Sequence, residues 1–87
     1  MEFQYRRKNE RKKYSTNVSY VHQDRSYPGT LKDISVGGCF IITSWVNHFS
    51  PGDIILVNIP YATKREAVKK RGRITWINNE GLGIEFY

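Results

Sequence analysis

Two short segments carry side chains whose types and spacing suit the binding of a ligand. Arg7 and Arg11 stand four positions apart in an RxxxR pattern, and Asp33, Ser35 and Gly38 form a DxSxxG pattern further along the chain. An arginine guanidinium is a planar fork of donors that can hydrogen-bond two acceptors at once or lie flat on an aromatic ring. A carboxylate accepts hydrogen bonds, which arginine cannot do, and a glycine permits close backbone approach. We therefore expect a binding site, with no catalytic residue and no bound metal.

Each pattern also has a purely structural explanation. The basic segment from Arg6 to Lys13 fits a solvated tail, because runs of charge usually face water. Asp33 and Ser35 fit the end of a strand at which both side chains cap backbone amides, and the two glycines that follow fit a simple bulge. The occurrence of both patterns in one chain favours the binding site over these explanations.

The charge of the chain favours an anionic partner. Fourteen Lys and Arg residues against eight Asp and Glu residues give a formal net charge of +6 over 87 residues. Six of the fourteen cations lie between Arg6 and Lys13, with no apolar residue among them to anchor the segment to a core. We therefore predict a flexible basic arm over residues 1–13 and one folded domain over residues 14–87.

The few cysteines and histidines argue against metal, disulfide and enzyme chemistry. Cys39 is the only cysteine, so it cannot form a disulfide within the chain, and His22 and His48 are too few to complete a zinc site with it. None of the three has the spacing of a catalytic triad, so we expect structural roles for them and no enzymatic activity. No apolar run is long enough to span a membrane or resembles a signal peptide, which predicts a cytoplasmic protein without membrane insertion.

After Tyr14 the sequence consists of short runs of β-branched and aromatic residues, which is typical of an antiparallel all-β domain. Turn-forming residues at 27–29, 50–53 and 78–81 separate the runs. The predicted strands are 17–22, 29–34, 38–43, 54–59, about 65–77 and 82–87. Residues 44–50 fit a helical turn or an ordered loop equally well. Six strands in a chain of this length predict a closed or nearly closed antiparallel β-barrel.

The last two predicted strands show the clearest alternation. Ile74 and Trp76 alternate with polar neighbours, and Leu82, Ile84 and Phe86 alternate on the following strand. Because alternate residues of a strand point to the same face, we expect these side chains to meet in the barrel interior. Trp76 is therefore predicted to be a core residue rather than a surface for stacking.

The two patterns, in this order and followed by a matching hairpin, resemble the PilZ domain family. The hairpin comprises Gly72-Arg73-Ile74-Thr75-Trp76 and Gly81-Leu82-Gly83-Ile84-Glu85-Phe86, and the resemblance extends over roughly residues 6–86. It implies a six-stranded antiparallel barrel of PilZ type whose ligand is the bacterial second messenger cyclic di-GMP, with no other cofactor. It also implies a receptor that changes conformation on binding and signals to a downstream protein.

Within this resemblance, the binding positions of the family fall on Arg7, Arg11, Asp33, Ser35 and Gly38. The arginines suit the O6 and N7 edge of guanine or the face of the base. We assign acceptance from the guanine N1 and N2 donors to Asp33, and donation to a phosphate or a base edge to Ser35. Auxiliary contacts are expected from neighbouring positions, namely Arg6, Lys8 and Gly37.

Two alternatives remain open. A small basic barrel that binds single-stranded nucleic acid would combine the arm with a second group of cations, Lys64, Arg65, Lys69, Lys70, Arg71 and Arg73. It explains the charge equally well but gives Asp33 no role, so nucleic acid is the less favoured partner. The other alternative is a PilZ-type barrel that docks another protein without binding a nucleotide, against which the matching Arg and Asp residues argue.

Overall fold

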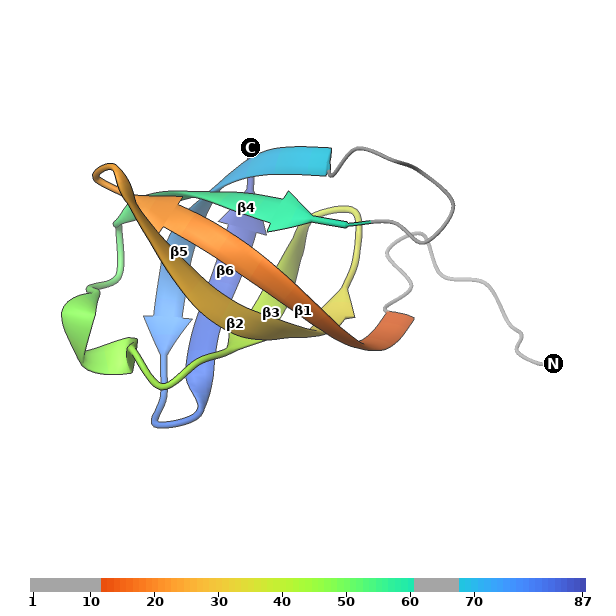
Figure 1. Cartoon of the computed structure of the whole chain (residues 1–87), viewed down its shortest axis with the longest axis horizontal. Helices are drawn as coiled ribbons and strands as arrows, with labels where there is room; N and C mark the ends of the chain where they lie inside the picture. Colours follow the sequence, from red (N-terminus) through yellow and green to blue (C-terminus); the bar gives the residue numbers. More distant parts are fainter. Residues whose placement is uncertain (1–11, 61–67) are drawn as a thin grey trace, which may run out of the picture.

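The chain folds into a closed barrel of six antiparallel strands in the order β1-β2-β3-β6-β5-β4 (Figure 1). The computed structural model describes residues 12–60 and 68–87. The strands are β1 (Lys12–His22), β2 (Arg25–Ile34), β3 (Gly38–Ile42), β4 (Ile54–Ile59), β5 (Val68–Ile77) and β6 (Gly81–Phe86), and a short 3-10 helix, η1 (Val46–His48), lies between β3 and β4. The all-β class and the six-stranded antiparallel barrel predicted from the sequence are confirmed.

The first hairpin differs from its prediction. Strand β1 begins at Lys12, so Lys12 and Lys13, which the sequence analysis placed in the arm, belong to the barrel. The turn to β2 lies at Gln23 and Asp24, both of which have positive φ, at 51° and 67°. Two successive residues of positive φ are typical of a type I′ hairpin turn, which usually contains glycine or asparagine. This turn has neither residue, and the sequence pattern therefore failed to reveal it.

Residues 27–29 were predicted to form a turn and instead lie inside β2. Pro28 pairs with Ser19 of β1 but precedes Thr30, where the pairing of β2 with β3 begins. Proline is tolerated in a strand where its missing N–H removes no ladder hydrogen bond. The rest of the predicted arm, residues 1–11, and the segment 61–67 lie outside the described residues.

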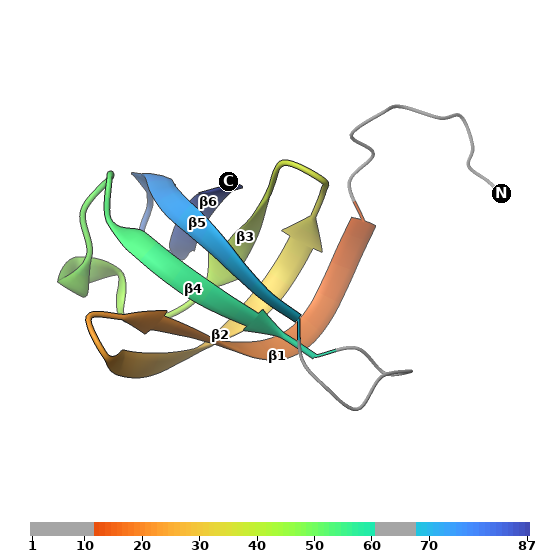
Figure 2. The same ribbon diagram turned by 90° about the horizontal axis from the view of Figure 1, so that it is seen from above.

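One apolar core fills the barrel. Its members are Val18, Tyr20, Tyr27, Leu31, Cys39, Ile41, Phe49, Ile55, Val57, Ile59, Ile74, Leu82 and Ile84. The β1–β2 turn and η1 lie at one end of the barrel, and the β2–β3 loop lies at the other (Figures 1 and 2). At the first end the buried hydroxyl of Tyr20 donates to Thr43 Oγ1 at 2.7 Å, and Thr43 Oγ1 donates to the carbonyl oxygen of Pro28 at 3.2 Å.

We expect Thr43→Val to lower the free energy of unfolding by about 1–3 kcal/mol, because it leaves the buried Tyr20 hydroxyl without its acceptor. Urea denaturation followed by circular dichroism measures this loss. Thr43→Ser is the matched control, because it retains the hydroxyl and should lose much less stability. Equal stability of the valine variant and the native chain would contradict this role of Thr43.

Candidate functional site

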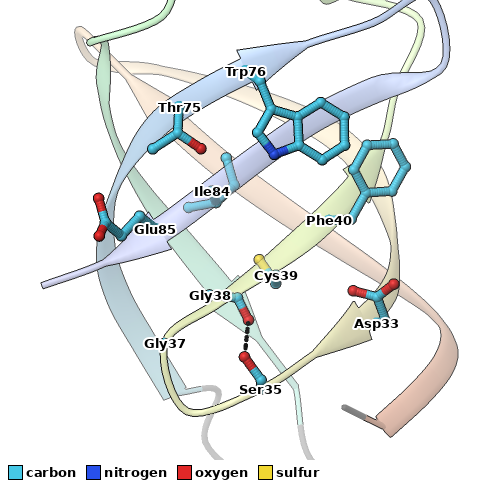
Figure 3. Close-up of a pocket in the computed structure, with 10 residues that line it drawn as sticks. All are labelled: Asp33, Ser35, Gly37, Gly38, Cys39, Phe40, Thr75, Trp76, Ile84 and Glu85. Carbon is cyan, nitrogen blue, oxygen red and sulfur yellow. Dashed lines mark hydrogen bonds between the residues drawn. The ribbon is translucent and has the colours of Figure 1, made fainter. Parts of the chain in front are cut away.

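A surface pocket of about 330 Å³ lies over β3 and β6, next to the β2–β3 loop (Figure 3). Its lining residues are Asp33, Ser35, Gly37, Gly38, Cys39, Phe40, Thr75, Trp76, Ile84 and Glu85. The pocket thus brings together all three residues of the DxSxxG pattern that were assigned to binding, and the auxiliary candidate Gly37. The other predicted site residues, Arg7, Arg11, Arg6 and Lys8, lie outside the described residues, and their roles stay predictions.

A β-bulge in β2 places Asp33 at the pocket. The pairing of β2 with β3 shifts by one residue between Leu31 and Asp33, so Asp33 pairs with Phe40. In a regular strand Asp33 would point into the core with Leu31, because alternate residues share a face. The extra residue, Lys32, reverses this direction and brings the Asp33 carboxylate to the outer surface. Ile34, the next residue, packs against the core instead.

A second bulge, in β5, changes the position of Trp76. The pairing of β5 with β6 shifts between Ile74 and Trp76, so that Trp76 pairs with Gly83. Trp76 is 50% exposed, and the prediction that it lies in the barrel interior is wrong. The extra residue, Thr75, interrupts the alternation on which that prediction rested. Ile74 does lie in the core, as predicted.

Trp76 and Phe40 form an aromatic stack along the pocket (Figure 3). Their ring centroids are 5.2 Å apart and their planes differ by 15°. Gly83 makes this arrangement possible, because a Cβ atom at that position would overlap the indole of Trp76. The strand pairings run from Asp33 to Phe40, then to Gly83 and Trp76 across four neighbouring strands. The Asp33 carboxylate and the two aromatic rings therefore lie in one row across the sheet.

Sequence reasoning missed Phe40 and Trp76 as site residues. No feature of the sequence marks Phe40 as a site residue, because the register between strands decides which residues lie beside it in the sheet. Trp76 faces a glycine across β5 and β6, and aromatic residues often cover a glycine on the adjacent strand. The pairing of Trp76 with Gly83 is the signal that would have found the stack.

Backbone hydrogen bonds hold the β2–β3 loop in place. The Ser35 N–H donates to the Gly38 carbonyl oxygen at 2.8 Å, and the Phe86 N–H donates to the Gly37 carbonyl oxygen at 2.9 Å. The Ser35 hydroxyl lies 3.5 Å from the Gly38 carbonyl oxygen, a long and therefore weak hydrogen bond. Ser35 thus does not cap an amide, and its hydroxyl loses little on turning toward a ligand.

Gly38 is required by the barrel itself. A Cβ atom on Gly38 would overlap the carbonyl oxygen of Ile84 in the neighbouring strand β6. Among the described glycines only Gly52 has a positive φ, so Gly38 does not serve an unusual backbone angle. The close approach at Gly38 is made by β6, and contact of its backbone with a ligand stays a prediction. Gly37, in contrast, has open space where its Cβ atom would lie.

The ionisable groups of the pocket are two carboxylates and a thiol. Asp33 and Glu85 lie on opposite sides of Gly38 and Cys39 (Figure 3). Cys39 is 8% exposed. Burial, and secondly the charge of Asp33, raise the pKa of its thiol to about 12. Cys39 is therefore a neutral core residue at physiological pH and no nucleophile.

Within residues 12–60 and 68–87 no cluster of three or more His, Cys, Asp or Glu side chains is placed to hold a metal ion. No helix in that part of the chain has the length and apolar character needed to cross a membrane. His22 lies near β4, with Nδ1 3.2 Å from the Ile54 carbonyl oxygen.

Comparison with known proteins places the chain in a family. The sequence profile described as PilZ domain matches residues 5–87. The chain belongs to the PilZ domain family. No curated protein matches the chain significantly.

The barrel is similar to solved PilZ structures. One is the PilZ domain of CeSA from a cellulose-synthesizing bacterium, with 18% identity, a TM-score of 0.76, and coverage of 90% of this chain and 80% of that one. Another is the Borreliella burgdorferi PlzA protein, solved in complex with c-di-GMP, with 17% identity and a TM-score of 0.69. The latter match covers 93% of this chain and 34% of PlzA. At these identities the likeness shows the shared fold.

In this PilZ domain we expect Gly38→Ala to destabilise the barrel by about 1–3 kcal/mol, because the new methyl group overlaps backbone that cannot move without breaking the pairing of β3 and β6. Gly37→Ala is the matched control one residue away, and should change the free energy of unfolding by at most about 0.5 kcal/mol. Urea denaturation of both variants makes the comparison. Equal effects of the two substitutions would refute the steric role of Gly38.

We expect Cys39 to react with Ellman's reagent at pH 8 only when the protein unfolds, since burial suppresses its thiolate. The folded-state pKa of about 12 lies above the ordinary value of 9.0. The unfolded chain therefore loses the thiol proton first, and stability from this group is present below pH 9 and lost as the pH rises toward 12. Cys39→Ala should lack this part of the pH dependence. Rapid reaction of the folded protein would contradict the assignment.

Proposed function

We propose that this PilZ domain is a receptor for cyclic di-GMP, which it binds in the pocket over β3 and β6 and reports to a partner protein. The observation that carries the proposal is the meeting of Asp33, Ser35 and Gly38 at one pocket, beside an exposed aromatic stack, in a barrel of this family. The PlzA relative solved with c-di-GMP supports the choice of ligand. In this proposal the chain binds and releases its ligand without catalysing a reaction.

Each pocket group has a role that matches one part of the dinucleotide. The Asp33 carboxylate accepts from the N1 and N2 donors of a guanine, and the stack of Phe40 and Trp76 supports the face of a base. Arg7 and Arg11 supply donors for guanine O6 and N7 and positive charge for the two phosphates, a charge that none of the described lining residues carries. The Ser35 hydroxyl donates to a phosphate or a base edge.

The signal in this proposal is a change of charge and shape at the surface over β3 and β6. Cyclic di-GMP brings two phosphate charges and covers the exposed indole of Trp76. A protein that contacts the barrel near the pocket would meet a different surface in each state. Such a partner can distinguish the states only through contacts that differ between them.

Calorimetric titration with cyclic di-GMP tests the site. We expect Arg7→Ala, Arg11→Ala and Asp33→Ala each to weaken binding by about 1–3 kcal/mol, the value of one bidentate base contact. Trp76→Ala should cost a similar amount through lost stacking, about 1–3 kcal/mol. Lys69→Ala is the control, because it removes only a screened, long-range attraction. Unchanged affinity in all of the first four variants would refute the assignment.

The same titration separates the receptor from a nucleic-acid-binding barrel. Because the ligand has two phosphates, the log-log dependence of its affinity on salt should have a slope of no more than about two. GTP should bind more weakly, and short RNA without guanine should not displace the ligand. A slope of about four or more, with displacement by RNA of any sequence, would favour the nucleic-acid barrel instead.

A further inference from the structure

The outer face of β5 carries a row of three exposed cations. Lys69, Arg71 and Arg73 point outward, whereas the intervening Gly72 and the following Ile74 are buried. Alternate residues of a strand are separated by about 6.7 Å, so the three side chains form a line about 13 Å long. We call these three residues the basic row.

Tyr87 holds two members of the basic row in place. Its ring centroid lies 5.9 Å from the Arg71 guanidinium carbon and 5.1 Å from that of Arg73. The Tyr87 N–H donates to the Arg71 carbonyl oxygen at 3.1 Å, which fixes the tyrosine beside β5. Such cation–π contacts restrict both guanidinium groups before any partner arrives, and this lowers the entropy cost of binding one.

An apolar ridge on β4 runs beside the basic row. Arg73 pairs with Ile54, Arg71 pairs with Leu56, and Lys69 pairs with Asn58. Ile54 is 42% exposed, and Leu56 is half-buried. No residue of β4 is acidic, so no carboxylate on that strand opposes the cations. The face therefore combines a line of positive charge with an adjacent line of apolar surface.

The basic row also adjoins the pocket. Glu85 lines the pocket and pairs with Arg73 across β5 and β6. Phe86, the next residue, donates its N–H to the Gly37 carbonyl oxygen in the β2–β3 loop, and Tyr87 follows directly. A rearrangement of the β2–β3 loop would thus move Phe86 and the adjacent Tyr87, whose ring contacts two members of the basic row.

We propose that the basic row, together with Ile54 and Leu56, docks an extended acidic segment of a partner protein. An extended segment lying edge-on along the boundary of β4 and β5 directs successive side chains to the two strands in turn. Its spacing of about 6.7 Å between alternate residues lets the acidic side chains face the three cations in register. Its other side chains then lie over the ridge on β4 and are apolar. Single-stranded nucleic acid matches the cations alone and gives Ile54 no role. The role of this site as the output surface of the receptor rests on the proposed function. Its role as a docking surface does not.

The test uses the full chain and a fluorescently labelled peptide in which Glu alternates with Leu, followed by anisotropy. The native chain should bind this peptide more tightly than a peptide of the same composition with its Glu residues in one block. Arg71→Gln combined with Arg73→Gln should weaken binding about tenfold through lost charge-assisted hydrogen bonds. Arg25→Gln combined with Lys32→Gln is the matched control, because it removes equal charge from exposed positions of β2 and should change affinity less than about twofold.

Three results would overturn the docking surface: equal loss in both double variants, equal binding of the blocked peptide, or tighter binding of an oligothymidylate of the same charge. The output role is tested by adding cyclic di-GMP, which should change the affinity for the peptide, while the peptide changes the affinity for the nucleotide by the same factor. Independent binding of the two ligands overturns that role. If cyclic di-GMP fails to bind while peptide binding still requires Arg71 and Arg73, the receptor proposal fails and the docking surface stands.

Discussion

Each side chain on a closed barrel must point either into the core or outward, and two β-bulges decide which side chains reach the pocket. The bulge in β2 directs Asp33 outward, and the bulge in β5 does the same for Trp76. Without the first bulge, Asp33 would enter a core that Leu31 already fills, and burying its carboxylate there would carry a desolvation cost of several kcal/mol. The irregularity that creates the site therefore also protects the fold.

Close approach of β3 and β6 makes the floor of the pocket. A Cβ atom at Gly38 would overlap the Ile84 carbonyl oxygen. A Cβ atom at Gly83 would displace Trp76 from its position over β6. Because glycine has no side chain, Gly38 permits the close pairing of β3 and β6 and leaves room above the floor of the pocket. In the proposed receptor, a substitution at Gly38 or Gly83 would therefore change both stability and binding.

The sequence predicts the parts of this structure that depend on local pattern. Alternation identified the strand class and placed Leu82 and Ile84 in the core, and the DxSxxG spacing identified three residues that one loop keeps together. It could not reveal the bulges, because Lys32 and Thr75 look like ordinary outward residues and one extra residue reverses the face of all that follow. The direction of Trp76 was wrong for this reason. The neighbours of Phe40 depend on register between strands, which no local pattern encodes.

The pocket and the basic row meet at Glu85 and Arg73, which pair across β5 and β6. The effect of ligand charge on the three cations should therefore decrease with distance from this pair. In the proposed receptor, a ligand in the pocket brings two phosphate charges, and Arg73 is the member of the basic row that pairs with a lining residue, Glu85. The Debye length is about 8 Å at physiological ionic strength, so this effect falls steeply along a row about 13 Å long. Arg73 therefore responds most to the nucleotide and Lys69 least. A partner held mainly at Arg73 would be strongly controlled by the ligand, whereas one held at Lys69 would remain bound in both states.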